Sequence, residues 1–283
     1  MQMNLNGIQR IAAFDDNGQG GNPAGVWIGA VLPPVAAMAQ IAREVGFSET
    51  VFAAPEGEGW RVRYFSPESE VPFCGHATIA LGAALARAQG DGCFALRLNA
   101  AEITVEGRLD GARMHAALQS PPTRSSPAPA ALTDAALALF GYHRADLDPR
   151  LAPACIHAGA DHLLLALNAR ATLAAMDYAL DAGRALMAQH GLVTIVLAWA
   201  EHERLFHTRN AFASGGVLED PATGAATAAL AGYLRDIGWP HGGRIEVVQG
   251  EDMGMRSLLG AEIGAGAGAS IRVAGTARMM QGL

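Results

Sequence analysis

The stretch Glu70–Leu81 reads EVPFCGHATIAL, and Glu219–Leu230, 149 residues further along, reads EDPATGAATAAL. Glu, Pro, Gly, Ala, Thr, Ala and Leu recur in register in the two copies. An arginine lies a few residues upstream of each copy, at Arg63 and at Arg209. Because the two copies are separated by about half of the chain, the sequence predicts two homologous halves.

Each copy places a proline and a glycine directly before a predicted helix of small apolar residues, 77–89 and 225–234. A helix that is apolar on all sides is buried, as when strands wrap around it. Glycine allows a ligand to approach the backbone, and the first N–H groups of a helix carry the positive end of its dipole. Either copy alone could be an ordinary core helix. The matched pair instead favours two helix N-termini that bind a carboxylate.

The remaining sequence predicts further strands and helices on both sides of one linker. The stretch 120–131 is rich in Pro, Ser, Thr and Ala and is the best linker candidate. We therefore expect an N-terminal half at 1–119, joined by the C-terminal strand 270–283, and a C-terminal half at 132–269. A helix over 35–45 and a long helix over 171–190 are also predicted.

Composition excludes several functional classes. The net charge is −7 without any basic run, so nucleic-acid binding is not expected. Residues 1–14 lack a basic start followed by an apolar run, so we expect no secretory signal there, and the longest apolar stretch, 191–200, is too short to span a membrane. Three widely separated cysteines fit a cytoplasmic location, and the absence of lysine excludes imine chemistry.

Two stretches resemble functional motifs only in part. The glycine-rich segment 264–268 lies between two predicted strands and lacks nucleotide-loop spacing, so it is interpreted as a hairpin turn. His202, Glu203 and His207 superficially resemble a zinc-protease motif. Their two histidines are five residues apart and would not share a helix face, so we expect no metal site.

Six segments, in order along nearly the whole chain, resemble the phenazine-biosynthesis isomerase (PhzF-like) family, which has a diaminopimelate epimerase-like fold. They are Phe14 with 22–26, 41–44 with 47–52, 70–80, 209–212, 219–224 and 249–254. The resemblance implies an α+β protein with two pseudo-symmetric domains, each a strand barrel around a central helix. It also implies an active site in the cleft between them, a homodimer, and no cofactor or metal.

The resemblance further implies that this is a cofactor-independent isomerase whose acid/base is Glu49, acting on a small carboxylate substrate. A glutamate can both accept and return a proton. His76 and Asp220 are expected to contact the substrate, and Gly75 and Gly224 to offer backbone N–H groups. The well-studied family members carry serine where this chain has Ala225, so one hydroxyl contact in the binding set is absent here.

Two alternatives remain open. Related epimerases and racemases use one thiol from each repeat, and Cys74 occupies the first of these positions. The matching position of the second repeat is Thr223, which makes an amino-acid epimerase less favoured and leaves Cys74 and Thr223 as residues lining the site. The other alternative is a non-catalytic metabolite-binding protein of the same fold.

Overall fold

A computed structural model describes residues 7–99, 101–111 and 113–280 and divides into two compact units. The first unit comprises residues 1–119 and 274–283, and the second comprises residues 120–273. The outermost residues of the predicted N-terminal half and C-terminal strand, 1–6 and 281–283, lie outside the described residues. Strands and helices are mixed in both units, which confirms the predicted α+β class.

The first unit is a closed ring of strands. Its elements are β1 (Ile8–Ala13), β2 (Asn22–Ile28), α1 (Val35–Val45), β3 (Glu49–Glu56), β4 (Gly59–Phe65), β5 (Glu70–Val71), α2 (Gly75–Gln89), β6 (Gly92–Arg97), β7 (Glu102–Asp110), β8 (Arg113–Gln119) and β17 (Arg272–Met279). Pairing runs from β17 through β1, β2, β3, β4, β6, β7 and β8, and β8 pairs again with β17. The pairs β2–β3 and β4–β6 are parallel and the other pairs with a described register are antiparallel.

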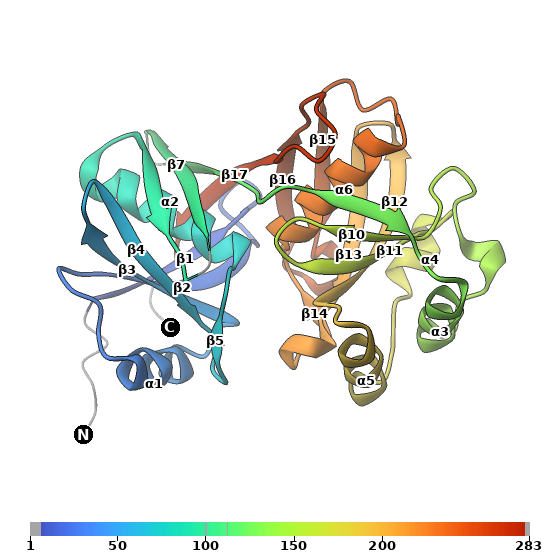
Figure 1. Ribbon diagram of the computed structural model, residues 1–283, viewed down its shortest axis with the longest axis horizontal. Coiled ribbons are helices and arrows are strands. Elements are labelled where there is room, and N and C mark those ends of the chain that lie inside the picture. Colours follow the sequence, from blue (N-terminus) through green and yellow to red (C-terminus); the bar gives the residue numbers. More distant parts are fainter. Residues whose placement is uncertain (1–6, 100, 112, 281–283) are drawn as a thin grey trace. The chain divides into compact units, whose positions relative to one another are not determined.

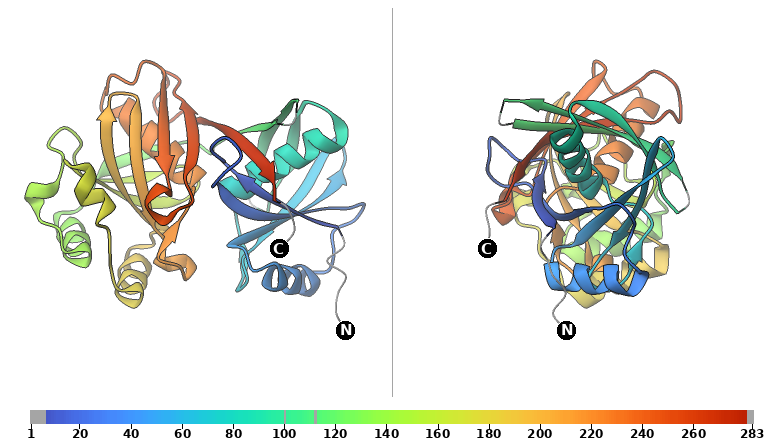
Figure 2. Two further views of the ribbon diagram at one scale, coloured as in Figure 1. Left: turned by 180° about the vertical axis from the view of Figure 1, so that it is seen from behind. Right: turned by 90° about the vertical axis from the view of Figure 1, so that its left-hand side faces the viewer.

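Helix α2 lies inside this ring, as the front and rear views show (Figure 1, Figure 2). Every residue from Gly75 to Ala86 is buried, as predicted for a helix of small apolar residues. A Cβ atom added to Gly107 of β7 would lie 2.2 Å from the carbonyl oxygen of Gly82 in α2. Helix and sheet backbones therefore touch here, and only glycine permits that approach.

The contact between Gly82 and Gly107 gives a matched test. Gly107→Ala should lower the free energy of unfolding by about 2–3 kcal/mol, because the new methyl group meets backbone that cannot move aside. Its cross-strand partner Gly92 is the control, since a Cβ there meets only the Phe94 ring at 3.4 Å. Denaturant unfolding should show a change within about 0.5 kcal/mol for Gly92→Ala. Equal effects of the two substitutions would contradict the packing argument.

The second unit repeats the plan around helix α6. Its elements are β9 (Arg124–Pro127), α3 (Ala130–Phe140), β10 (Ala154–His157), β11 (Asp161–Ala166), α4 (Arg170–Ala174), α5 (Leu180–His190), β12 (Thr194–His202), β13 (Leu205–Ala211), β14 (Glu219–Asp220), α6 (Gly224–Asp236), β15 (Arg244–Gln249) and β16 (Ser257–Glu262). Here β11–β12 and β13–β15 are the parallel pairs, in the same relative places as in the first unit. Residues 224–234 of α6 are buried, and the helix packs against β9, β10, β11, β15 and β16.

An arginine–glutamate pair occupies the same place in both units. Arg63 on β4 contacts Glu70 on β5 through Nε and Nη2, and Arg209 on β13 contacts Glu219 on β14 in the same way. In the first unit this contact holds the pKa of Glu70 below its usual value, mainly because Arg63 donates hydrogen bonds to it. The sequence repeat is therefore also a repeat of structure, from the arginine to the central helix.

Two sequence predictions differ from the structure. The predicted linker 120–131 contains β9, which pairs with β10, while Ser120 and Thr123 donate backbone hydrogen bonds to Ile271 and Gly268. The predicted helix 171–190 is two helices, α4 and α5. Between them Arg209 Nη1 donates to the carbonyls of Ala174 and Met176, which takes oxygens that a continuous helix would use itself.

The other helices cover the outside of the strands. Helix α1 has the predicted bounds and packs Met38, Ile41 and Val45 against Phe52 and Phe65 of the first unit. Residues of α3, α4 and α5 form a separate apolar cluster with β11 and β12. No helix among the described residues combines the length and apolar character that a membrane crossing requires.

Candidate active site

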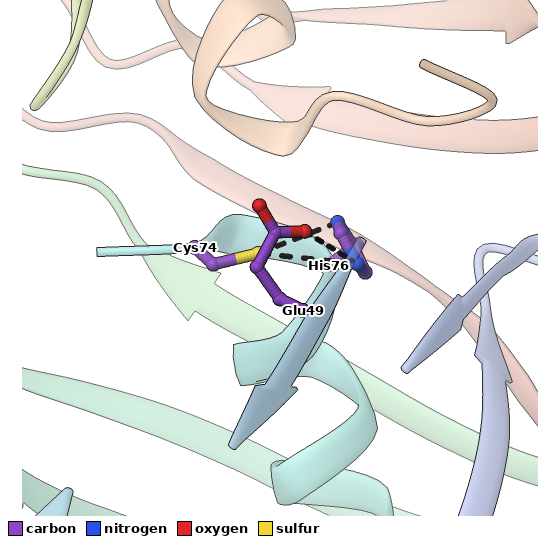
Figure 3. Close-up of side chains that lie close together, drawn as sticks. All are labelled: Glu49, Cys74 and His76. Atoms are coloured by element: carbon purple, nitrogen blue, oxygen red, sulfur yellow. Dashed lines mark hydrogen bonds and ion pairs between the residues drawn. The ribbon is translucent and has the colours of Figure 1, made fainter. Parts of the chain in front are cut away.

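Glu49, Cys74 and His76 converge in the first unit, with their side chains turned toward one another (Figure 3). The Nε2 atom of His76 lies 3.4 Å from Oε2 of Glu49, and Nδ1 lies 3.4 Å from Sγ of Cys74. All three residues are buried, with exposed fractions of 7%, 8% and 4% for Glu49, Cys74 and His76. The structure therefore gathers three of the predicted site residues into one cluster.

Local structure accounts for this convergence. Glu49 is the first residue of β3 and pairs with Ala24 near the start of the parallel strand β2. Cys74 is the N-cap residue of α2, and His76 is in its first turn. The neighbouring Gly25 keeps β2 close, because a Cβ atom there would lie 2.7 Å from Oγ1 of Thr50. Two strand starts and one helix start thus meet at the cluster.

Asn22 and Ser48 complete the surroundings of the imidazole. Nδ2 of Asn22 lies 3.1 Å from Nδ1 of His76, and Oγ of Ser48 lies 3.5 Å from Nε2. Because the amide N–H of Asn22 donates to Nδ1, the proton of a neutral imidazole resides on Nε2, facing Glu49. The arrangement orients His76 so that it can share a proton with the carboxylate.

The second unit gathers the other predicted residues at the start of α6. Thr223 is the N-cap residue, Gly224 and Ala225 begin the helix, and Oγ1 of Thr223 donates to Oδ2 of Asp220 over 2.5 Å. The fully buried Gln249 receives a hydrogen bond from the Thr223 N–H and donates to the Asp220 carbonyl, at 3.1 Å and 2.7 Å. Gln249 therefore fixes the turn that leads into the helix.

The sequence alone assigned no role to Asn22, Ser48 or Gln249, although all three lie in the quoted family segments. No local spacing pointed to them, because their contacts join residues that are far apart in sequence. The other predicted groups fall into two sets: Glu49, Cys74, Gly75 and His76 belong to the first unit, whereas Asp220, Thr223, Gly224 and Ala225 belong to the second. Cys74 and Thr223 hold equivalent N-cap positions, as the repeat predicts.

The counterpart of Glu49 in the second unit is Thr194. It begins β12 and pairs with His162 of the parallel strand β11, as Glu49 pairs with Ala24. Nδ1 of His162 lies 2.7 Å from Oγ1 of Thr194. Burial lowers the pKa of His162 to about 3, because the charged imidazolium loses its hydration. The second unit thus holds a neutral polar pair where the first holds an acid.

His162 makes a prediction about pH and stability. Its pKa is about 3 when folded and about 6.5 when unfolded, so the unfolded chain binds the extra proton between these values. Lowering the pH from 7 to 5 protonates His162 in the unfolded chain alone, which should lower the free energy of unfolding by about 2 kcal/mol. In denaturant unfolding, the free energy of unfolding of His162→Gln should therefore fall less between pH 7 and pH 5 than that of wild type. The exposed His190→Gln should behave like wild type, and identical pH profiles for all three would contradict the assignment.

The zinc-protease-like residues do not form such a site. His202 and His207 lie on the antiparallel strands β12 and β13 rather than on a helix. The ring of His207 bridges Glu201 and Glu251, at 2.8 Å and 2.6 Å. This contact joins β13 to the turn that follows β15.

Comparison with known proteins identifies the family. A family model described as phenazine biosynthesis-like protein matches residues 11–282. The chain belongs to this family. A trans-2,3-dihydro-3-hydroxyanthranilate isomerase of Pseudomonas aeruginosa is 32% identical over 88% of this chain and 87% of its own. An uncharacterized isomerase of Mesorhizobium japonicum is 32% identical over 91% of each chain.

Solved structures agree on the fold. A PhzF-family protein of Bacillus anthracis matches with a TM-score of 0.85 at 20% identity, covering 97% of this chain and 96% of that one. A hydroxyproline epimerase of Agrobacterium vitis matches with a TM-score of 0.65 at 10% identity, covering 97% and 90%. These matches confirm the predicted diaminopimelate epimerase-like fold.

Proposed function

We propose that this family member is a cofactor-independent isomerase in which Glu49 moves a hydrogen between two carbon atoms of a small cyclic or conjugated carboxylate. The observation that carries the proposal is the buried contact of 3.4 Å between Glu49 and His76. The carboxylate accepts a proton from one carbon, and the resulting carboxyl group returns a proton to another, so the reaction needs no net acid, base or redox partner. The curated relatives that are named isomerases support this reaction class.

Binding of the substrate is proposed to use groups of both units. Gly75 and Gly224 begin the two central helices, whose first N–H groups suit a carboxylate. Asp220 accepts hydrogen bonds from the Thr223 hydroxyl and, at its backbone carbonyl, from the Gln249 amide, so its position is fixed before a substrate binds. A cleft between the units, a cytoplasmic location and a homodimer stay predictions from the family resemblance.

The two-thiol epimerase alternative has less support. It needs a thiol at both equivalent N-cap positions, and these are Cys74 and Thr223. Cys93 is exposed on β6, and Cys155 lies on β10, so neither takes the place of the second thiol. The match to a probable proline racemase and a hydroxyproline epimerase, at 12% and 10% identity, concerns the fold alone.

The proposal is tested by turnover of trans-2,3-dihydro-3-hydroxyanthranilate and related unsaturated carboxylates. Glu49→Gln should lower kcat about 10²–10⁴-fold, because the amide cannot act as the acid/base. Glu44→Gln is the matched control, since Glu44 is exposed on α1, where it accepts a hydrogen bond from Gln40. Undiminished turnover by Glu49→Gln would contradict the role of Glu49. Tight binding without turnover by wild type would favour the non-catalytic binding protein.

A further inference from the structure

The Glu49–Cys74–His76 trio also has the composition and spacing of a zinc ligand set. One oxygen, one sulfur and one nitrogen donor lie within 4.8 Å of one another. Nε2 of His76 lies 3.4 Å from Oε2 of Glu49 and 3.9 Å from Sγ of Cys74. Tetrahedral zinc, with bonds of about 2.0–2.3 Å, places neighbouring ligand atoms roughly 3.3–3.6 Å apart. The Nε2–Oε2 separation already has this value, and rotation of the Cys74 side chain would have to shorten the Nε2–Sγ separation of 3.9 Å.

The surroundings of His76 suit a metal ligand as well. A histidine that binds zinc through Nε2 carries its proton on Nδ1 and usually donates it to a neighbouring acceptor. Asn22 already contacts Nδ1 at 3.1 Å, and an amide that turns by half a rotation presents its oxygen instead of its nitrogen. The buried Asn22 can therefore hold the ring in the orientation that either state requires.

We propose that this trio binds one Zn²⁺ ion, which inhibits the protein rather than serving as its cofactor. Three protein ligands leave a fourth position for water or a carboxylate oxygen. On binding, the Cys74 thiol releases its proton to solvent, and the imidazole proton moves from Nε2 to Nδ1. The Glu49 carboxylate then coordinates the metal and no longer accepts a proton from a substrate.

The sequence did not suggest this ligand set, because Glu49 is separated from Cys74 by a long stretch of the first unit's chain. Metal motifs are recognised in sequence by short spacings between ligands, such as those of His202 and His207. Here the start of β3 and the start of α2 become neighbours only when the barrel closes. Zinc binding follows from the geometry alone, whereas inhibition rests on the proposed function of Glu49.

Zinc binding is tested on the chelator-treated full chain by isothermal titration calorimetry with Zn²⁺. Wild type should bind one ion, and Cys74→Ser should weaken binding by at least about tenfold, the loss that even an outer-shell change produces. Cys155→Ser, which removes the half-buried thiol on β10, should bind as wild type does. Equal affinity of wild type and Cys74→Ser, or no binding by wild type, would overturn the proposal.

Two further measurements keep the test independent of any folding defect in one variant. Co²⁺ added to wild type should give a sulfur-to-cobalt charge-transfer band that Cys74→Ser lacks and that His76→Gln weakens. In wild type, Zn²⁺ should slow alkylation of Cys74 at least tenfold while leaving that of the exposed Cys93 unchanged. A cobalt band that persists in Cys74→Ser, or equal protection of both cysteines, would contradict a site at the trio.

The result for zinc and the result for turnover can fail separately. Loss of Zn²⁺ affinity in Cys74→Ser without turnover of any carboxylate by wild type would support the metal site and contradict the proposed reaction. Glu49-dependent turnover that Zn²⁺ does not affect would support the reaction and contradict the inference. Inhibition by Zn²⁺ that a chelator reverses, and that Cys74→Ser weakens, supports both.

Discussion

The fold of each unit depends on how little side-chain volume its central helix carries. In the first unit α2 is so slim that its backbone meets β7 where Gly82 faces Gly107, and the ring of strands closes around it. Larger residues would force the strands apart, because protein interiors have no spare volume. The same contact sets how closely α2 approaches β7, and Cys74 and His76 lie at the start of that helix. The candidate chemistry is thus a consequence of helix packing.

The second unit keeps this architecture but has different chemistry at the equivalent positions. Thr194 stands where the first unit has Glu49, and Thr223 stands where it has Cys74. The arginine–glutamate pair is present in both units, where it joins two strands just before the central helix. The start of the central helix is therefore flanked by Glu49 and Cys74 in the first unit and by the neutral side chains of Thr194 and Thr223 in the second.

The sequence predicted those features that depend on local composition or on the repeat. Helix α1 and the two small-residue helices follow from such patterns, and so does the equivalence of Cys74 and Thr223. The break between α4 and α5 was not predictable, because it depends on Arg209 reaching carbonyls from a distant strand. Strand β9 was hidden for a similar reason: its proline- and serine-rich sequence is typical of a linker until β10 pairs with it.

The candidate site likewise has features that the sequence predicted and features that depend on contacts between distant residues. Glu49 and His76 came from the family resemblance, whereas their contact and the roles of Asn22 and Ser48 required the three-dimensional structure. Gln249 was part of a recognised segment, but its function as a clamp depends on two hydrogen bonds to a turn on another element. The family resemblance indicated which residues to consider, and the packing shows which of them are in contact.

The most direct measurement of the central claim is the position of deuterium in the product when wild type acts in deuterated water. If Glu49 carries the hydrogen, any deuterium that NMR finds in the product should lie at the carbon that receives the hydrogen. The remaining positions should stay unlabelled. Label at the original carbon without isomerisation would indicate an epimerase-type exchange. Product formation with Gln in place of Glu49 and an unchanged labelling pattern would contradict the account.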